Sequence, residues 1–347
     1  MLFELYDLPF DAQGARLLLG LVMGLVFGVA AQVSRFCLRR GLVSGPTRAP
    51  ALGTWAAALA TAIAATSLAV WAGFVDLSGH RLMTADLPLL AIVLGGLAFG
   101  IGMTMTRGCA SRLTVLSGTG NLRAITVMLV FAVVAHATLK GVFAPVRVAL
   151  GSVSTDLGIA SLAELPGGIL TWAALVVAGL VAAVVVLKPR PLHVAMAVLI
   201  GLVVTSGWIT TGWLLLDDFD PQPIDSMSFT ATWADALFWT VASSSIPAGF
   251  GLGVVGGVLG GAFLSALARR ELAFVSFTDA PQTLRYMAGG ALMGFGGVLA
   301  GGCTVGAGLS GVSMLSVAAI IALMAIAAGA LLADRALNRM PVMQPAE

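Results

Sequence analysis

Residues 95–112 read GGLAFGIGMTMTRGCASR, and residues 289–304 read GGALMGFGGVLAGGCT. When the two stretches are aligned on Cys109 and Cys303, five glycines of the first coincide with five glycines of the second. Chance similarity between apolar stretches rarely places five glycines and a cysteine in one register. The chain therefore contains an internal repeat.

The composition is that of a membrane protein. Of the 347 residues, 59% are apolar and 10% are charged, whereas soluble domains carry about 25% charged residues. A chain with this few charges cannot cover a surface that faces water. We therefore predict an all-α polytopic membrane protein in contact with lipid. The basic residues are scattered, which argues against a nucleic-acid partner.

The glycines of the repeat predict close helix packing followed by a break. Gly96 and Gly100, and likewise Gly290 and Gly294, are four residues apart, a spacing that lets helix backbones approach closely in a membrane. The glycines next to each cysteine then predict a break in the helix. Broken or re-entrant helices occur at membrane depth only where they are buried in protein or line a cavity, and in duplicate they mark the central site of a transporter. We therefore predict that the broken helices meet at a central constriction.

The repeat and the apolar runs predict how the chain is divided. We expect one integral membrane domain over residues 1–347, with related halves at 15–140 and 247–335 and connecting helices at 141–246. The expected spans are residues 17–33, 51–71, 88–105, 122–140, 168–187, 192–213, 250–267, 286–300 and 315–332, and residues 231–245 are too short to cross a bilayer core of ~30 Å.

Charge placement predicts the orientation. Arginines cluster after the first span, whereas residues 217–225 are acidic and contain no Lys or Arg. Under the positive-inside rule the arginine cluster is cytoplasmic and the acidic loop is outside. We expect the N-terminus outside, the C-terminus in the cytoplasm and an odd number of crossings.

The three cysteines, Cys37, Cys109 and Cys303, each stand at a predicted helix end or break. A thiolate is a soft metal ligand, but no His, Met or second Cys lies at ligand spacing, so we predict no metal and no cofactor. A redox pair would need two cysteines within bridging distance, which sequence cannot establish. A neutral thiol, which an apolar site favours, is a weak S–H donor suited to a soft, sulfur-bearing anion. A purely structural buried thiol is the remaining alternative.

Three motifs resemble those of a known family. SRFCLRRGL at residues 34–42, RGCASRLTVLSGTGNLRAI at 107–125 and GGCTVGAGLSG at 301–311 are similar to the signatures of the YeeE/YedE family, bacterial inner-membrane carriers of thiosulfate and related sulfur compounds. The resemblance covers residues 15–335. It implies an hourglass-shaped body in which Cys37, Cys109 and Cys303 pass thiosulfate by successive S–H···S contacts. Several members work beside a small soluble sulfur-carrier protein, so the resemblance also suggests such a partner.

Residues beside the cysteines have two interpretations each. Arg107 and Arg112 flank Cys109 and either attract an anion or anchor the chain at the membrane surface. Thr304, like Ser111, either offers a hydroxyl to a substrate or satisfies backbone groups freed at a break. The supporting residues are Gly108, Arg107, Arg112, Gly302 and Thr304.

The function we predict is import of thiosulfate, or a related sulfur anion, across the bacterial inner membrane, without enzymatic chemistry. Two other functions stay open at this point. One is transport of another sulfur or selenium species such as sulfide or sulfite. The other is a membrane thiol oxidoreductase or sulfurtransferase, which the absence of closely spaced cysteine pairs in the sequence disfavours.

Overall fold

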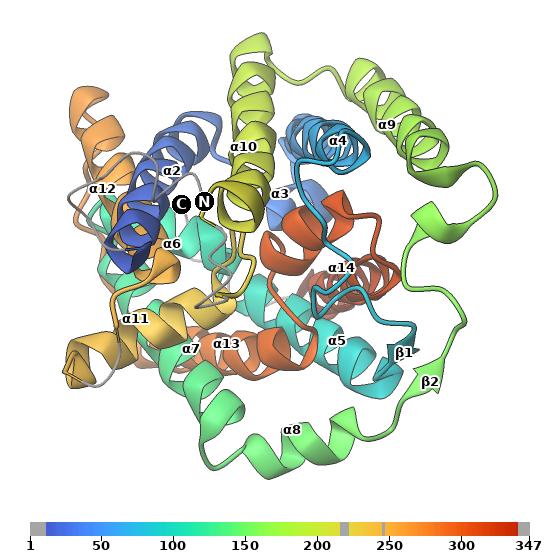
Figure 1. Cartoon of the computed structure of the whole chain (residues 1–347). Coiled ribbons are helices and arrows are strands. Elements are labelled where there is room, and N and C mark those ends of the chain that lie inside the picture. Colours follow the sequence, from blue (N-terminus) through green and yellow to red (C-terminus); the bar gives the residue numbers. More distant parts are fainter. Residues whose placement is uncertain (1–11, 216–221, 245–246, 339–347) are drawn as a thin grey trace.

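The computed structural model describes residues 12–215, 222–244 and 247–338 (Figure 1). Its helices are α2 (Ala12–Ser34), α3 (Leu38–Leu42), α4 (Arg48–Trp71), α5 (Leu89–Met105), α6 (Ala110–Gly118), α7 (Leu122–Lys140), α8 (Ala144–Gly151), η1 (Leu162–Glu164), α9 (Gly168–Leu187), α10 (Pro191–Ile209), η2 (Thr210–Leu214), α11 (Thr230–Ala242), α12 (Phe250–Ala268), α13 (Ala280–Leu299), η3 (Gly306–Gly311) and α14 (Val317–Asn338). Two short strands, β1 (Asp86–Leu87) and β2 (Thr155–Asp156), pair antiparallel.

Within the described residues, eight helical segments are long and apolar enough to cross a membrane. The chain is therefore an all-α, multi-pass membrane protein, as the composition predicts. Helix α9 lies at the edge of the molecule (Figure 1), and Ala173 is its one buried residue. A helix that is apolar all round and hardly buried by protein is suited to contact with lipid.

Several sequence-based boundaries were wrong. Helix α13 begins six residues before the predicted span at 286, because Asp279 accepts a hydrogen bond from the Gln282 N–H and Pro281 occupies the first turn. Capping by Asp and an early Pro are typical helix starts. The short helices α3 and α6 were missed, since each is too short and too polar to resemble a span. Residues 217–221 of the expected outer loop at 217–225 lie outside the described residues.

Helices α5 and α13 cross in opposite directions with their backbones in contact. A Cβ atom added to Gly95 would lie 2.7 Å from the carbonyl oxygen of Gly296, and one added to Gly296 would lie 2.5 Å from that of Gly95. Gly102 and Gly289 have the same reciprocal relation, at 2.5 and 2.9 Å. Four of the repeated glycines are thus explained by one close helix crossing.

The remaining glycine pairs pack each broken helix against a partner from the other end of the chain. Gly96 and Gly100 of α5 face α14, whereas Gly290 and Gly294 of α13 face α7. These contacts confirm that the glycines predicted to allow close helix packing do face neighbouring helices. This exchange of partners is also the arrangement expected of two related halves, although their boundaries at 15–140 and 247–335 remain predictions.

Two further helix pairs run parallel beside this centre. Gly20, Gly24 and Gly28 of α2 approach successive turns of α12. Helix α10 packs parallel to α4. A Cβ on Gly201 would contact the Ala58 carbonyl oxygen, and further along both helices the Thr205 and Thr66 hydroxyl oxygens are 3.0 Å apart. Helix α10 comes from the segment predicted only to connect the halves, so the packed body includes that segment.

Candidate functional site

Each of the three cysteines follows a helix that ends in the same way. A residue with left-handed backbone stands two positions before each thiol: Arg35 (φ 51°), Arg107 (φ 57°) and Gly301 (φ 75°). At the first break the Phe36 N–H bonds to the Ala31 carbonyl at 3.0 Å, and at the second the Gly108 N–H bonds to the Met103 carbonyl at 3.1 Å. This pattern ends a helix while satisfying its last carbonyls.

The left-handed residue is arginine at the Cys37 and Cys109 breaks, and at the Cys109 break the sequence had suggested Gly108 instead. Gly108 lies one residue later, and a Cβ there would meet the side chain of Leu113 at 3.1 Å. A Cβ on Gly302 would lie 2.6 Å from the Ala307 backbone nitrogen. These two glycines therefore allow close approach beside the thiols, whereas the neighbouring residue turns the chain.

The breaks bring two of the thiols into contact and bury the third in the same core cluster. Cys37 is the N-cap residue of α3 and Cys109 is that of α6, and their Sγ atoms are 3.9 Å apart. Cys109 Sγ is 3.3 Å from the Ser111 hydroxyl oxygen, and Cys303 Sγ accepts the Gly306 N–H at 3.3 Å. The close pair, 72 residues apart in sequence, could not be foreseen from cysteine spacing.

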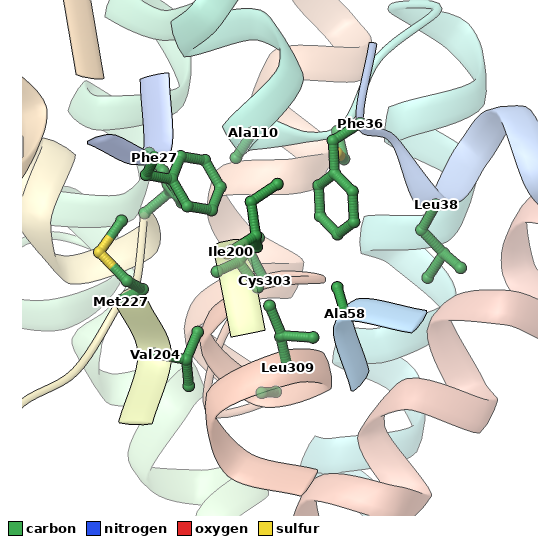
Figure 2. Packing of buried hydrophobic residues seen from close by; sticks show 14 of the residues in the cluster. Phe27, Phe36, Leu38, Ala58, Ala110, Ile200, Val204, Met227, Cys303 and Leu309 are labelled. Atoms are coloured by element: carbon green, nitrogen blue, oxygen red, sulfur yellow. The ribbon is translucent and has the colours of Figure 1, made fainter. Parts of the chain in front are cut away.

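The surroundings of the thiols are apolar and closed. Cys37, Cys109 and Cys303 are 3%, 1% and 0% exposed and belong to the same core cluster. Figure 2 shows Cys303 among side chains that come from segments far apart in the sequence, including Phe36 and Ile200. Solvent does not reach the thiols, so an ion that contacts them must shed most of its water.

A fourth segment reaches this centre, and sequence reasoning missed it. It is the approach to α11, Ser226–Thr230, in which Phe229 is fully buried and packs on Phe27 with ring centroids 5.5 Å apart. The Thr230 hydroxyl faces the Cys303 thiol. The available signal was the run SMSFT, in which small hydroxyl residues precede a helix too short to span.

The predicted supporting residues separate into two groups. Thr304 is 1% exposed and faces Cys109, and the Arg112 guanidinium lies in electrostatic range of Cys37 and Cys109. Arg107, in contrast, is exposed. The structure therefore brings Thr304 and Arg112 to the thiols and leaves Arg107 at the surface.

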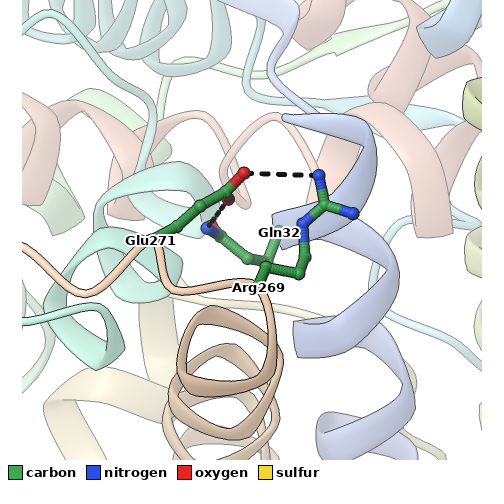
Figure 3. A network of polar contacts seen from close by, with 3 residues as sticks. All are labelled: Gln32, Arg269 and Glu271. Carbon is green, nitrogen blue, oxygen red and sulfur yellow. Dashed lines mark hydrogen bonds and ion pairs between the residues drawn. The ribbon is translucent and has the colours of Figure 1, made fainter.

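An arginine cluster lies at the end of the molecule where α2 and α5 stop. Its members, which interact electrostatically with one another or with the thiols, are Arg35, Arg39, Arg40, Arg107 and Arg112. Among the described residues, Arg39 Nε and Arg112 Nη1 are buried without a hydrogen-bond partner. Nearby, Glu271 joins Gln32 at 3.1 Å and Arg269 at 3.3 Å, which links the ends of α2 and α12 (Figure 3).

Comparison of the sequence with known proteins identifies the family of this chain. Residues 33–332 match the family described as sulphur transport. The chain belongs to the sulphur transport family. Two members are named thiosulfate transporter TsuA: that of Escherichia coli (strain K12) is 28% identical over 338 residues, covering 87% of this chain and 89% of its own. That of Spirochaeta thermophila is 28% identical over 329 residues, covering 87% and 93%.

Membership of the sulphur transport family settles one of the open alternatives. Members of the family and the two relatives are transporters, not enzymes. The oxidoreductase alternative is therefore set aside. The sequence argument against it was wrong, however, because the folded protein does contain a close cysteine pair, Cys37 and Cys109. The resemblance of the three cysteine motifs to this family is confirmed.

The loop between α4 and α5 covers the break at Cys303. Arg81 donates a hydrogen bond to the Gly301 carbonyl at 3.2 Å, and Ser316 donates to the Leu82 carbonyl at 2.5 Å. His80 packs on the Trp208 indole, with ring centroids 5.1 Å apart. This loop thus holds the backbone immediately before the Gly302–Cys303 pair.

His80 predicts how acid affects this loop. Burial, and secondarily the neighbouring Arg81, lowers the pKa of His80 to about 4, whereas an unfolded histidine has a pKa of about 6.5. The folded protein therefore keeps its full free energy of unfolding, as far as His80 is concerned, above pH ~6.5. As the pH drops from there toward 4, that free energy falls by up to about 3 kcal/mol. Thermal unfolding of the detergent-purified protein between pH 7.5 and 4.5 measures this loss. The His80→Gln variant should lose less stability over the same range; an equal loss would assign the effect to other groups.

Proposed function

We propose that this protein imports thiosulfate across the bacterial inner membrane, along a path lined by Cys37, Cys109 and Cys303. The observations that carry the proposal are the burial of all three thiols at helix breaks within one core cluster and the contact between Cys37 and Cys109, whose Sγ atoms are 3.9 Å apart. The name of the two relatives, thiosulfate transporter, supports the choice of ion.

The chemistry of the thiols suits this ion. Thiosulfate has a terminal sulfur atom that is soft and polarizable, and a neutral thiol is a weak S–H donor with a similarly soft sulfur. A row of weak contacts favours passage, because conduction requires binding that is loose enough to release the ion. In this mechanism the ion moves from one S–H···S contact to the next, and no covalent bond forms.

Arginines at the two ends would guide the anion toward and away from the thiols. We assign Arg81, on the loop over the Cys303 break, to the entrance, because its side chain donates to the Gly301 carbonyl. We assign Arg39 and Arg112 to the exit, because each has a buried N–H donor without a partner among the described residues. A cationic vestibule raises the local concentration of an anion.

The charge distribution also supports an orientation. The arginine cluster at the ends of α2 and α5 would face the cytoplasm under the positive-inside rule. If α13, which runs antiparallel along α5, crosses the membrane in addition to the eight apolar segments, the N-terminus is outside and the C-terminus inside. A green fluorescent protein fused to the C-terminus should fluoresce, since it matures in the cytoplasm; a dark fusion that is still made would reverse the orientation. The soluble sulfur-carrier partner suggested by the family resemblance stays a prediction.

Uptake by bacteria that lack other thiosulfate transporters tests the function. Cells that make this protein should grow with thiosulfate as the sole sulfur source, whereas cells with an empty vector should not. Both should grow equally on cysteine. Purified protein in lipid vesicles should accumulate labelled thiosulfate, and a hundredfold excess of sulfate should compete poorly. If the vesicles do not accumulate thiosulfate but do take up sulfide or sulfite, that species is the substrate instead of thiosulfate.

A further inference from the structure

Three buried hydroxyl groups near the thiols have no oxygen or nitrogen hydrogen-bond partner in the described part of the protein. They are those of Ser228, Thr230 and Thr304. The polar groups that Thr230 and Thr304 face are the thiols themselves. Thr230 and Thr304 are 5% and 1% exposed. Burying a hydroxyl without a partner is unfavourable, and buried polar groups are nearly always satisfied. A thiol is only a weak hydrogen-bond partner, so these hydroxyls can donate to a stronger acceptor that is not part of the chain.

The positions of these residues explain why the protein does not satisfy them. A serine or threonine inside a helix can bond to the carbonyl four residues earlier, as Thr232 does with Ser228 at 2.8 Å. Ser228 and Thr230 stand at the start of α11, and Thr304 lies between α13 and η3. No preceding helical turn offers them a carbonyl, so their O–H groups remain available.

The hydroxyls converge on the thiols. Thr230 faces Cys303, and Thr304 faces Cys109. Ser228 lies against the start of η3, three residues after Cys303, since a Cβ on Gly306 would be 2.7 Å from its Oγ atom. Sulfur and hydroxyl donors therefore surround the same part of the protein.

The segment that carries two of these hydroxyls is held in place on both sides. Ser226 donates to the Val204 carbonyl at 2.7 Å, and Ser310 donates to the Met227 carbonyl at 2.7 Å. Between them, Phe229 packs on Phe27. Donors fixed before the ligand arrives lose little freedom on binding, which favours affinity.

We propose that Ser228, Thr230 and Thr304 bind the oxygen atoms of the transported anion while the thiols contact its terminal sulfur. This assignment rests on the proposed function and extends it to the other end of the ion. Thiosulfate has three oxygen atoms that share its negative charge, and hydroxyl groups are good donors to such acceptors. Two kinds of donor would thus select an ion that has both a soft sulfur and an oxygen face.

Removal of single hydroxyls tests this assignment. Thr230→Val and Thr304→Val keep the shape of the side chain and remove the donor. Each should raise the half-saturating thiosulfate concentration in vesicle uptake about tenfold, and the double variant by more, because a hydrogen bond to a charged group is lost. Thr230→Ser, which keeps the hydroxyl, should restore a value within about threefold of wild type.

A matched control separates this role from a structural one. Thr232→Val removes a hydroxyl from the same helix, but one that bonds to its own backbone, and it should stay within about twofold of wild type. The proposal is overturned if wild type carries thiosulfate and the Thr230 and Thr304 variants do so with unchanged half-saturation, or if Thr230→Ser is as impaired as Thr230→Val. A wild-type protein that carries no thiosulfate would instead refute the proposed function.

Discussion

Replacing Cys109 by alanine is expected to reduce thiosulfate uptake by about 10- to 100-fold, the largest effect of any single thiol. Cys109 contacts both a second thiol and a hydroxyl, with its sulfur 3.9 Å from that of Cys37 and 3.3 Å from the Ser111 hydroxyl oxygen. Its loss removes a donor to a charged ion, worth ~1.5–3 kcal/mol, and removes the sulfur that contacts Cys37. Initial uptake of labelled thiosulfate into vesicles measures the effect.

Two comparisons make this prediction specific to sulfur. Cys109→Ser keeps a small donor but replaces a soft sulfur by a hard oxygen, so it should remain strongly impaired. Ser111→Ala removes a neighbour of the thiol and leaves the sulfur in place, so its loss should be within about fivefold, the size expected for one neutral hydrogen bond. Full uptake by Cys109→Ala, at equal amounts of folded protein, would make the thiol structural and remove the basis of the relay.

Replacing Gly257 by valine is expected to prevent stable folding. A Cβ at this position would collide with the backbone carbonyl of Leu21 on α2. Because the obstacle is backbone, the two helices must separate, and overpacking of this kind costs about 1–3 kcal/mol or more. Helix α2 leads directly to Cys37, so its displacement would also move that thiol away from Cys109.

The same helix provides the control for this effect. Gly260 lies three residues further along α12, and a Cβ there would meet nothing within 4 Å. Gly260→Val should therefore yield wild-type amounts of monodisperse protein on size-exclusion chromatography in detergent, with an unchanged melting temperature. Similar behaviour of the Gly257 and Gly260 variants would mean that the α2–α12 contact does not stabilise the protein.

The sequence alone determined the class of the fold and the positions of the breaks. Long apolar runs must form helices in lipid, because each backbone group has to be bonded within its own segment. The repeated glycines predicted close packing at Gly96, Gly100, Gly290 and Gly294, and each now faces another helix. These features depend on residues that are near one another in sequence, so local patterns were sufficient.

Only the tertiary structure decided which groups meet. Cys37 and Cys109 are in contact across 72 residues of sequence, and Thr230 reaches Cys303 from a segment that had been predicted only to connect two halves. The left-handed arginines at two breaks have no local signal, since an isolated arginine rarely takes that conformation. Such contacts depend on how whole helices pack, and the order of residues along one helix does not specify its neighbours.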